Sequence, residues 1–110
     1  MSESSRSQIR SYIKAQYKLP DERLEELLPT FINTLVGHIA NLEKAMADGG
    51  LSGIGRTAHT LKGALLNLGL HDLAELAREI EQNGKGAVVE FDYDAVMVHL
   101  KQSVEDVAGS

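Results

Sequence analysis

The chain has 110 residues, of which 43% are hydrophobic and 25% charged, and its formal net charge is −5. This length and composition predict one globular domain over residues 1–110 and exclude collagen-like and disordered chains, while the negative charge disfavours binding to nucleic acid. The lack of cysteine excludes disulfides and thiol nucleophiles, and because neither a signal peptide nor an apolar run of 18 residues is present, we expect a cytoplasmic protein without membrane insertion.

Helical spacing of apolar residues predicts two helices in the first half of the chain. The first is short and ends before Leu19-Pro20, and its apolar positions are Ile9, Tyr12, Ile13 and Tyr17. The second runs from Asp21 to the glycines after Asp48, with an inward stripe of Leu24, Leu28, Phe31, Leu35, Ile39, Leu42 and Met46. Pro29 lacks a backbone donor, so we expect a kink there or a break near Leu28.

The second half predicts three further helices. One spans Ser52 to Leu68, with Ile54, Ala58, Leu61, Leu65 and Leu68 inward and Gly69 as its stop. The next runs from about His71 to Asn83, with Leu73, Leu76, Ala77 and Ile80 inward. Val88 and Val89 are predicted to lie in a loop, since a lone strand would have no partner. Asp92 or Asp94 then caps a last helix with Val96, Leu100, Val104 and Val107 inward.

These elements predict an all-α fold. Because the connections are short, neighbouring long helices should be antiparallel. We therefore expect an antiparallel up-and-down four-helix bundle over about residues 21–108, with the additional short N-terminal helix laid across one end.

One outward patch of the third predicted helix combines unusual residue types. His59 lies more than about 100° from the inward stripe, and Lys62, Gly63 and Leu66 follow it at helical spacing. An exposed histidine alone is most often idle, and the spacing of Lys62 alone fits an ordinary solvated lysine equally well. Together, an imidazole beside an ammonium group predicts a histidine that carries an anion.

Gly63 requires its own explanation, because a glycine within a helix costs about 1 kcal/mol relative to alanine. Two interpretations remain open. Either another helix packs tightly against Gly63, or the surface of a partner approaches the helix closely beside His59.

Glu81 is the predicted partner of the imidazole. His59 lies 10 residues before Gly69 and Glu81 lies 12 after it, so the two should stand at similar heights on adjacent antiparallel helices. A carboxylate that accepts the Nδ1 proton would leave Nε2 unprotonated and nucleophilic. The alternative is a solvated glutamate on the shoulder of its helix.

A family resemblance follows from these residues. The run Ala58-His59-Thr60-Leu61-Lys62-Gly63, followed by Asn67-Leu68-Gly69 and by Leu73, Ala77 and Ile80-Glu81, resembles the signature of histidine-containing phosphotransfer domains of two-component phosphorelays. The signature spans about 25 residues, and the wider likeness begins with the preceding helix at Leu28.

The resemblance implies a phosphocarrier rather than an enzyme. His59 would be the phosphoacceptor, Lys62 would stabilise the phosphoryl group and Glu81 would orient the ring. A receiver domain of a response regulator or hybrid sensor kinase would dock on Gly63, Leu66, Arg56 and Gly55. No cofactor is expected on this chain, because Mg²⁺ would belong to the receiver, and we expect a monomer. The family tends to carry small residues where this chain has Leu65 and Leu66, so we expect Leu66 either to enlarge the apolar docking surface or to narrow the choice of partner.

Three other classes compete with this interpretation. A sensor-kinase dimerisation helix carries an acidic residue directly after its histidine, whereas this chain has Thr60. A metalloprotein would have to use His38, His59, His71 and His99, which form no metal-binding motif. A helical adaptor that binds a partner without phosphate chemistry, as an inactive relative of the carriers, remains the main alternative.

Overall fold

The computed structural model of the chain describes residues 5–109, with the backbone only for Ser5 and Arg6, and helices are the only regular secondary structure over this range. The prediction of an all-α fold is confirmed. The predicted domain limits, 1 and 110, lie outside the described residues. The five helices are α1 (Ser5–Tyr17), α2 (Asp21–Asp48), α3 (Leu51–Asn67), α4 (His71–Lys85) and α5 (Tyr93–Gly109).

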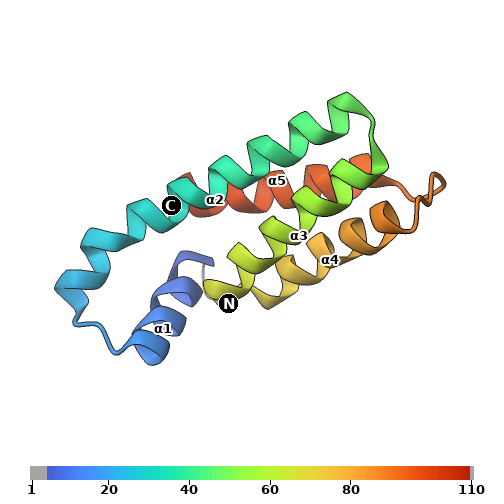
Figure 1. Ribbon diagram of the computed structural model, residues 1–110. Coiled ribbons are helices and arrows are strands. Elements are labelled where there is room, and N and C mark those ends of the chain that lie inside the picture. The colour runs from blue at the N-terminus through green and yellow to red at the C-terminus, as the bar shows by residue number, and fades with distance from the viewer. Residues whose placement is uncertain (1–4, 110) are drawn as a thin grey trace.

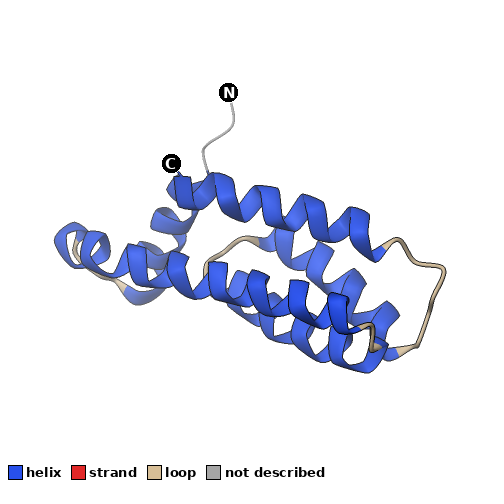
Figure 2. Ribbon diagram, turned by 90° about the horizontal axis from the view of Figure 1, so that it is seen from above, coloured by secondary structure: helices blue, strands red, loops and turns tan. Residues whose placement is uncertain are grey.

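The helices α2 to α5 run in alternating directions and surround one apolar core (Figure 1). Both α2 and α4 contact α3 and α5, and the contact between α3 and α4 is the most extensive. The short α1 lies at one end, where it packs on α2 and α5 (Figures 1 and 2). The largest fully buried side chains are Ile9, Ile13, Leu28, Leu35, Leu42, Leu61, Leu65, Ile80, Leu100, Val104 and Val107.

The long helix α2 continues through Pro29, so the predicted break near Leu28 is wrong. Proline removes the backbone donor that would bind the carbonyl of Glu25. Both Pro29 and Glu25 are exposed. The inward stripe also differs from the prediction, because Ile32 is buried while Phe31 and Met46 are only half-buried.

The turn between α3 and α4 requires its glycine. Gly69 has a φ of +76°, in the left-handed region, and a Cβ there would overlap the ring of Tyr12 from α1. The same ring meets His71 edge to face, with ring centres 5.9 Å apart. Gly69 therefore both ends α3 and leaves room for the ring of Tyr12, so that α1 can pack against the turn.

The prediction for the inward face of α4 is confirmed in part. Ala77 and Ile80 are buried as predicted, but Leu73 and Leu76 are half-buried. The other buried residues of the helix are Ala74, Glu81 and Gly84. The predicted end at Asn83-Gly84 is wrong, since the helix continues to Lys85. Small residues at the centre of the face bring the backbone of α4 close to α3.

The connection from α4 to α5 contains no strand, as predicted for Val88 and Val89. Tyr93 donates a hydrogen bond from its hydroxyl to the carbonyl of Val88, and burial raises the pKa of that phenol. Asp92 caps α5, because its Oδ1 accepts a hydrogen bond of 3.0 Å from the backbone N–H of Ala95. On α5, Met97 is buried and Val96 only half-buried.

Candidate functional site

His59 stands on the outer side of α3 and contacts a residue of α4. The neighbouring Leu61 and Leu65 point into the core, and a residue advances about 100° around a helix, so His59 faces outward. Its side chain is 60% exposed, and its Nδ1 lies 2.6 Å from Oε2 of Glu81. One edge of the imidazole is therefore held by the protein, and the ring is open to solvent.

Glu81 is the only buried charged or polar residue within residues 7–109, with 4% of its surface exposed. Its two carboxylate oxygens meet three side chains. Oε1 lies 2.7 Å from Nζ of Lys62, and Oε2 lies 2.8 Å from Nζ of Lys85 in addition to its contact with His59. A carboxylate without such partners would be costly to bury, so these contacts explain how Glu81 is accommodated.

The protonation state of Glu81 follows from these contacts. Burial raises the pKa of the carboxyl group, but hydrogen bonds from Lys62, Lys85 and His59 together outweigh burial and lower the pKa to about 2. Glu81 is therefore ionised at neutral pH and only accepts hydrogen bonds. Nδ1 of His59 must then be the donor, which leaves a lone pair on Nε2 of the neutral ring.

Two glycines let the helices approach closely one turn away from this contact. A Cβ on Gly84 would lie 2.8 Å from the backbone N of Gly55 and 2.8 Å from the backbone O of Leu51. Gly55 is buried at this crossing, and its prediction as a partner-binding residue is wrong. Its location has a physical cause: only a residue without a side chain fits between α3 and α4 there.

The remaining residues of the predicted partner surface lie on the outside of α3. Arg56 is exposed, and Leu66 exposes 40% of its surface. A Cβ on Gly63 would have no atom of another described helix within 4 Å. Tight packing against another described helix therefore does not explain Gly63. Of the two interpretations of Gly63, close approach of a partner is the one that remains.

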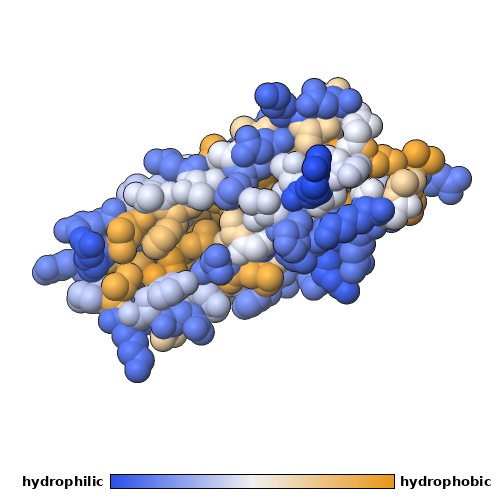
Figure 3. All heavy atoms as spheres, viewed as in Figure 1, coloured by the Kyte–Doolittle hydropathy of each residue, from blue (hydrophilic) through white to orange (hydrophobic). Residues whose placement is uncertain are grey.

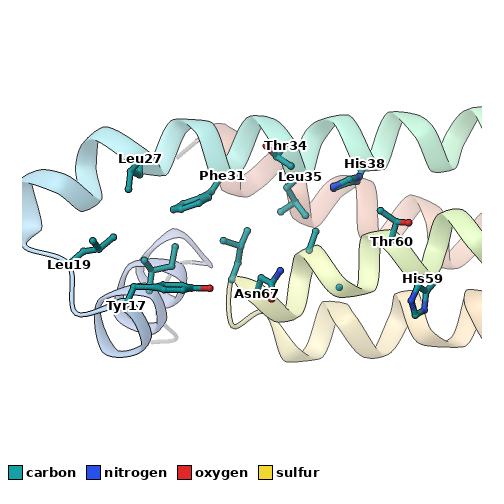
Figure 4. Close-up of a pocket in the computed structure, with 14 residues that line it drawn as sticks. Tyr17, Leu19, Leu27, Phe31, Thr34, Leu35, His38, His59, Thr60 and Asn67 are labelled. Carbon is teal, nitrogen blue, oxygen red and sulfur yellow. The ribbon is translucent and has the colours of Figure 1, made fainter.

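An apolar groove of about 720 Å³ begins beside His59 and runs towards α1. It lies between α2 and α3, and Figure 3 shows apolar side chains gathered in this hollow. Figure 4 shows His59 and Thr60 at one end of the groove and Tyr17 and Leu19 at the other. Gly63 belongs to its wall, so the groove and the outer face of α3 form one continuous surface.

The sequence interpretation did not include Lys85 or the groove. Lys85 follows Glu81 by four residues on the same helix, and this spacing was the available signal. The groove combines residues from α1, α2 and α3, so it depends on how the helices are arranged in space.

The other histidines do not contact the cluster of His59, Lys62, Lys85 and Glu81. His38 lines the groove from α2, His71 packs against Tyr12, and His99 is exposed on α5. Over the described part of the chain, no three His, Asp or Glu side chains gather closely enough to hold a metal ion. Nor does any helix of residues 5–109 have both the length and the apolar character to span a membrane.

The family model of the Hpt domain matches residues 26–110. The chain belongs to the Hpt family. The match includes all of α3 and α4, so the contacts of His59, Lys62 and Glu81 lie inside the Hpt domain. Hpt domains are phosphocarriers of two-component signalling rather than catalysts, and they interact with receiver or kinase partners. Comparisons with curated proteins and with solved structures gave no match.

Proposed function

We propose that this Hpt domain accepts a phosphoryl group on Nε2 of His59 from the aspartyl phosphate of a receiver domain and passes it to another receiver. The observation that carries the proposal is the hydrogen bond between the exposed imidazole and the buried, ionised Glu81. This contact holds the proton on Nδ1, so the nitrogen with the free lone pair is Nε2.

The transfer step can be written from these groups. The lone pair of Nε2 forms a bond to phosphorus while the bond between phosphorus and the aspartate oxygen breaks, and its electron pair returns to the aspartate carboxylate. The ring becomes positively charged and keeps its Nδ1 proton, which Glu81 stabilises as the acceptor at 2.6 Å. The reverse sequence loads the second receiver.

Lys62 supports this step by its charge. Its side chain is 24% exposed, and it reaches Glu81 from the same helix that carries His59. An ammonium group at this location favours the anion that arrives on the ring. We infer that Lys62 stabilises the phosphoryl group, while Mg²⁺ and in-line positioning come from the receiver. On this proposal the chain itself contributes neither ATP binding nor kinase activity.

The surface around His59 determines how the receiver docks. The open side of Gly63 allows close approach, while Leu66 and the adjoining groove offer apolar contact and Arg56 offers a positive charge. We propose that helices α2 to α5, over about residues 21–108, form the antiparallel up-and-down four-helix bundle that supports this surface. The carrier would act as a cytoplasmic monomer.

The proposal is tested by incubating the chain with a panel of phosphorylated receivers and measuring phosphate on the carrier. We expect acid-labile, base-stable label on the wild type and none on His59→Gln. His99→Gln is the matched control, because His99 is an exposed histidine on another helix, and it should label normally.

Two results would contradict the phosphocarrier. Full labelling of His59→Gln would place the phosphate elsewhere. Receiver binding without any label on the wild type would favour the adaptor that uses the same surface without phosphate chemistry.

A further inference from the structure

Lys85 shares an acceptor oxygen with the phosphoacceptor ring. Its Nζ lies 2.8 Å from Oε2 of Glu81, the same oxygen that meets Nδ1 of His59 at 2.6 Å. Lys62 occupies the other oxygen at 2.7 Å. Each oxygen of the carboxylate is therefore fixed by a lysine, one from α3 and one from α4, and rotation of the carboxylate would break both contacts.

The stem of Lys85 is confined by the crossing of α3 and α4. A Cβ on Gly55 would lie 3.0 Å from the backbone N of Lys85 and 3.1 Å from its Cγ. The preceding residue, Gly84, is in still closer contact with α3. Although the side chain of Lys85 is 54% exposed, its first carbons lie against the backbone of α3. Its approach to Glu81 thus depends on the packing of the two helices.

The two lysines also set the charge around His59. One carboxylate and two ammonium groups leave the cluster with one net positive charge when the imidazole is neutral. The whole chain has a formal charge of −5. A phosphoryl group on a histidine nitrogen would thus arrive at a positively charged location on an acidic protein, which favours the anion.

We propose that Lys85 is a positioning residue for phosphotransfer, which holds Oε2 of Glu81 against Nδ1 of His59 and so keeps Nε2 free to react. This inference rests on the proposed function of His59 and deepens it. Lys85 acts through Glu81, whereas the ring itself takes the phosphoryl group. Without the ammonium group, Oε2 loses one of its two partners, and the carboxylate can turn away from the ring.

The test compares Lys85→Met, which keeps an apolar stem without the charge, with Lys85→Arg, which restores a cation. Nitrogen NMR of the imidazole in the unphosphorylated chain measures the ratio of the Nδ1-protonated to the Nε2-protonated form. In Lys85→Met we expect this ratio and the transfer rate from a phosphorylated receiver to fall about two- to fivefold, the size typical of a partly exposed ion pair. Lys85→Arg should recover most of both losses.

Lys101→Met provides the matched control. Lys101 also forms an ion pair, with Glu43 at 2.9 Å, and is 44% exposed, but it lies on α5 away from Glu81. It should leave the tautomer ratio and the transfer rate unchanged. The proposal on Lys85 is overturned if Lys85→Met keeps the wild-type tautomer ratio. It is also overturned if the wild type is labelled by a receiver and Lys85→Met is labelled at the same rate.

The tautomer measurement separates this proposal from the function on which it rests. It needs no phosphate, so a shifted ratio in a chain that no receiver labels would support the positioning role and refute the phosphocarrier. Normal labelling of the wild type together with an unaltered ratio in Lys85→Met would refute the positioning role alone.

Discussion

Alanine at Gly63 and alanine at Gly84 should have opposite effects on stability. Both glycines lie inside helices, where alanine is favoured by about 1 kcal/mol. The surroundings differ. A Cβ at residue 63 meets no atom of another described helix within 4 Å, whereas a Cβ at residue 84 lies 2.8 Å from two backbone atoms of α3.

The magnitudes follow from these distances. Gly63→Ala should raise the free energy of unfolding by about 0.5–1 kcal/mol, because none of the residues that the structure describes on other helices lies close enough to oppose the helix propensity of alanine. For Gly84→Ala the obstructing atoms belong to the backbone and cannot rotate away, so the helices must separate. Such overpacking costs about 1–3 kcal/mol, and after the gain in propensity of about 1 kcal/mol we expect a net loss of up to about 2 kcal/mol.

The phosphotransfer rate should fall in both variants, although one is more stable and the other less stable than the wild type. Gly63→Ala leaves the contact between His59 and Glu81 intact, yet its methyl group stands where we expect the receiver to approach, so transfer should slow in the more stable protein. Gly84→Ala should slow transfer for another reason, because separation of α3 and α4 lengthens that contact of 2.6 Å.

Urea unfolding of both variants, together with transfer rates from one phosphorylated receiver, measures these effects. The imidazole NMR signals of the unphosphorylated protein should change in Gly84→Ala and stay the same in Gly63→Ala. A Gly84→Ala protein stabilised by the full propensity of alanine would refute the close crossing. A stabilised Gly63→Ala protein with the wild-type transfer rate would refute the docking role of Gly63.

Two further predictions concern the charges at the site. Because its pKa is lowered from 4.5 to about 2 in the folded chain, ionised Glu81 contributes stability that is present in full above pH 4.5 and is lost as the pH falls towards 2. Unfolding at pH 7 and pH 3 should show a difference between wild type and Glu81→Gln that is about 2 kcal/mol smaller at pH 3, because pH 3 lies about 1.5 units below the pKa of the unfolded carboxyl group, and a constant difference would contradict the lowered pKa. Lys62→Ala should slow transfer about tenfold while circular dichroism shows the same helix content, and an unchanged rate would remove Lys62 from the site.

Helix α3 could be predicted closely because large aliphatic residues mark its inward face. Ile54, Ala58, Leu61, Leu65 and Leu68 were expected to be buried, and all of them are. The direction of His59 followed from that stripe. Its level relative to Glu81 followed from the helical rise counted in both directions from Gly69. These inferences needed only regular helix geometry and the location of one turn.

Helix α4 was harder to predict because its inward face is made of small residues. Leu73 and Leu76 dominate the hydrophobic pattern of this helix, so the predicted inward face was centred away from Ala74 and Gly84. The same pattern predicted Glu81 at the edge of that face. For Pro29 a local rule predicted a kink or a break in α2. The break is wrong, because burial of Leu28 and Ile32 favours continuation of the helix.

The small residues of α4 also explain why the site could not be completed from the sequence. Alanine and glycine contribute little to a pattern of hydrophobicity, yet they decide how near two helix backbones can come. Gly55 and Gly84 set that distance one turn from His59, and the distance determines whether Glu81 is a solvated glutamate or a buried acceptor. It also brings Lys85 onto the same oxygen as the imidazole. Glycines that face each other across two helices are therefore as much a part of this site as its charged residues.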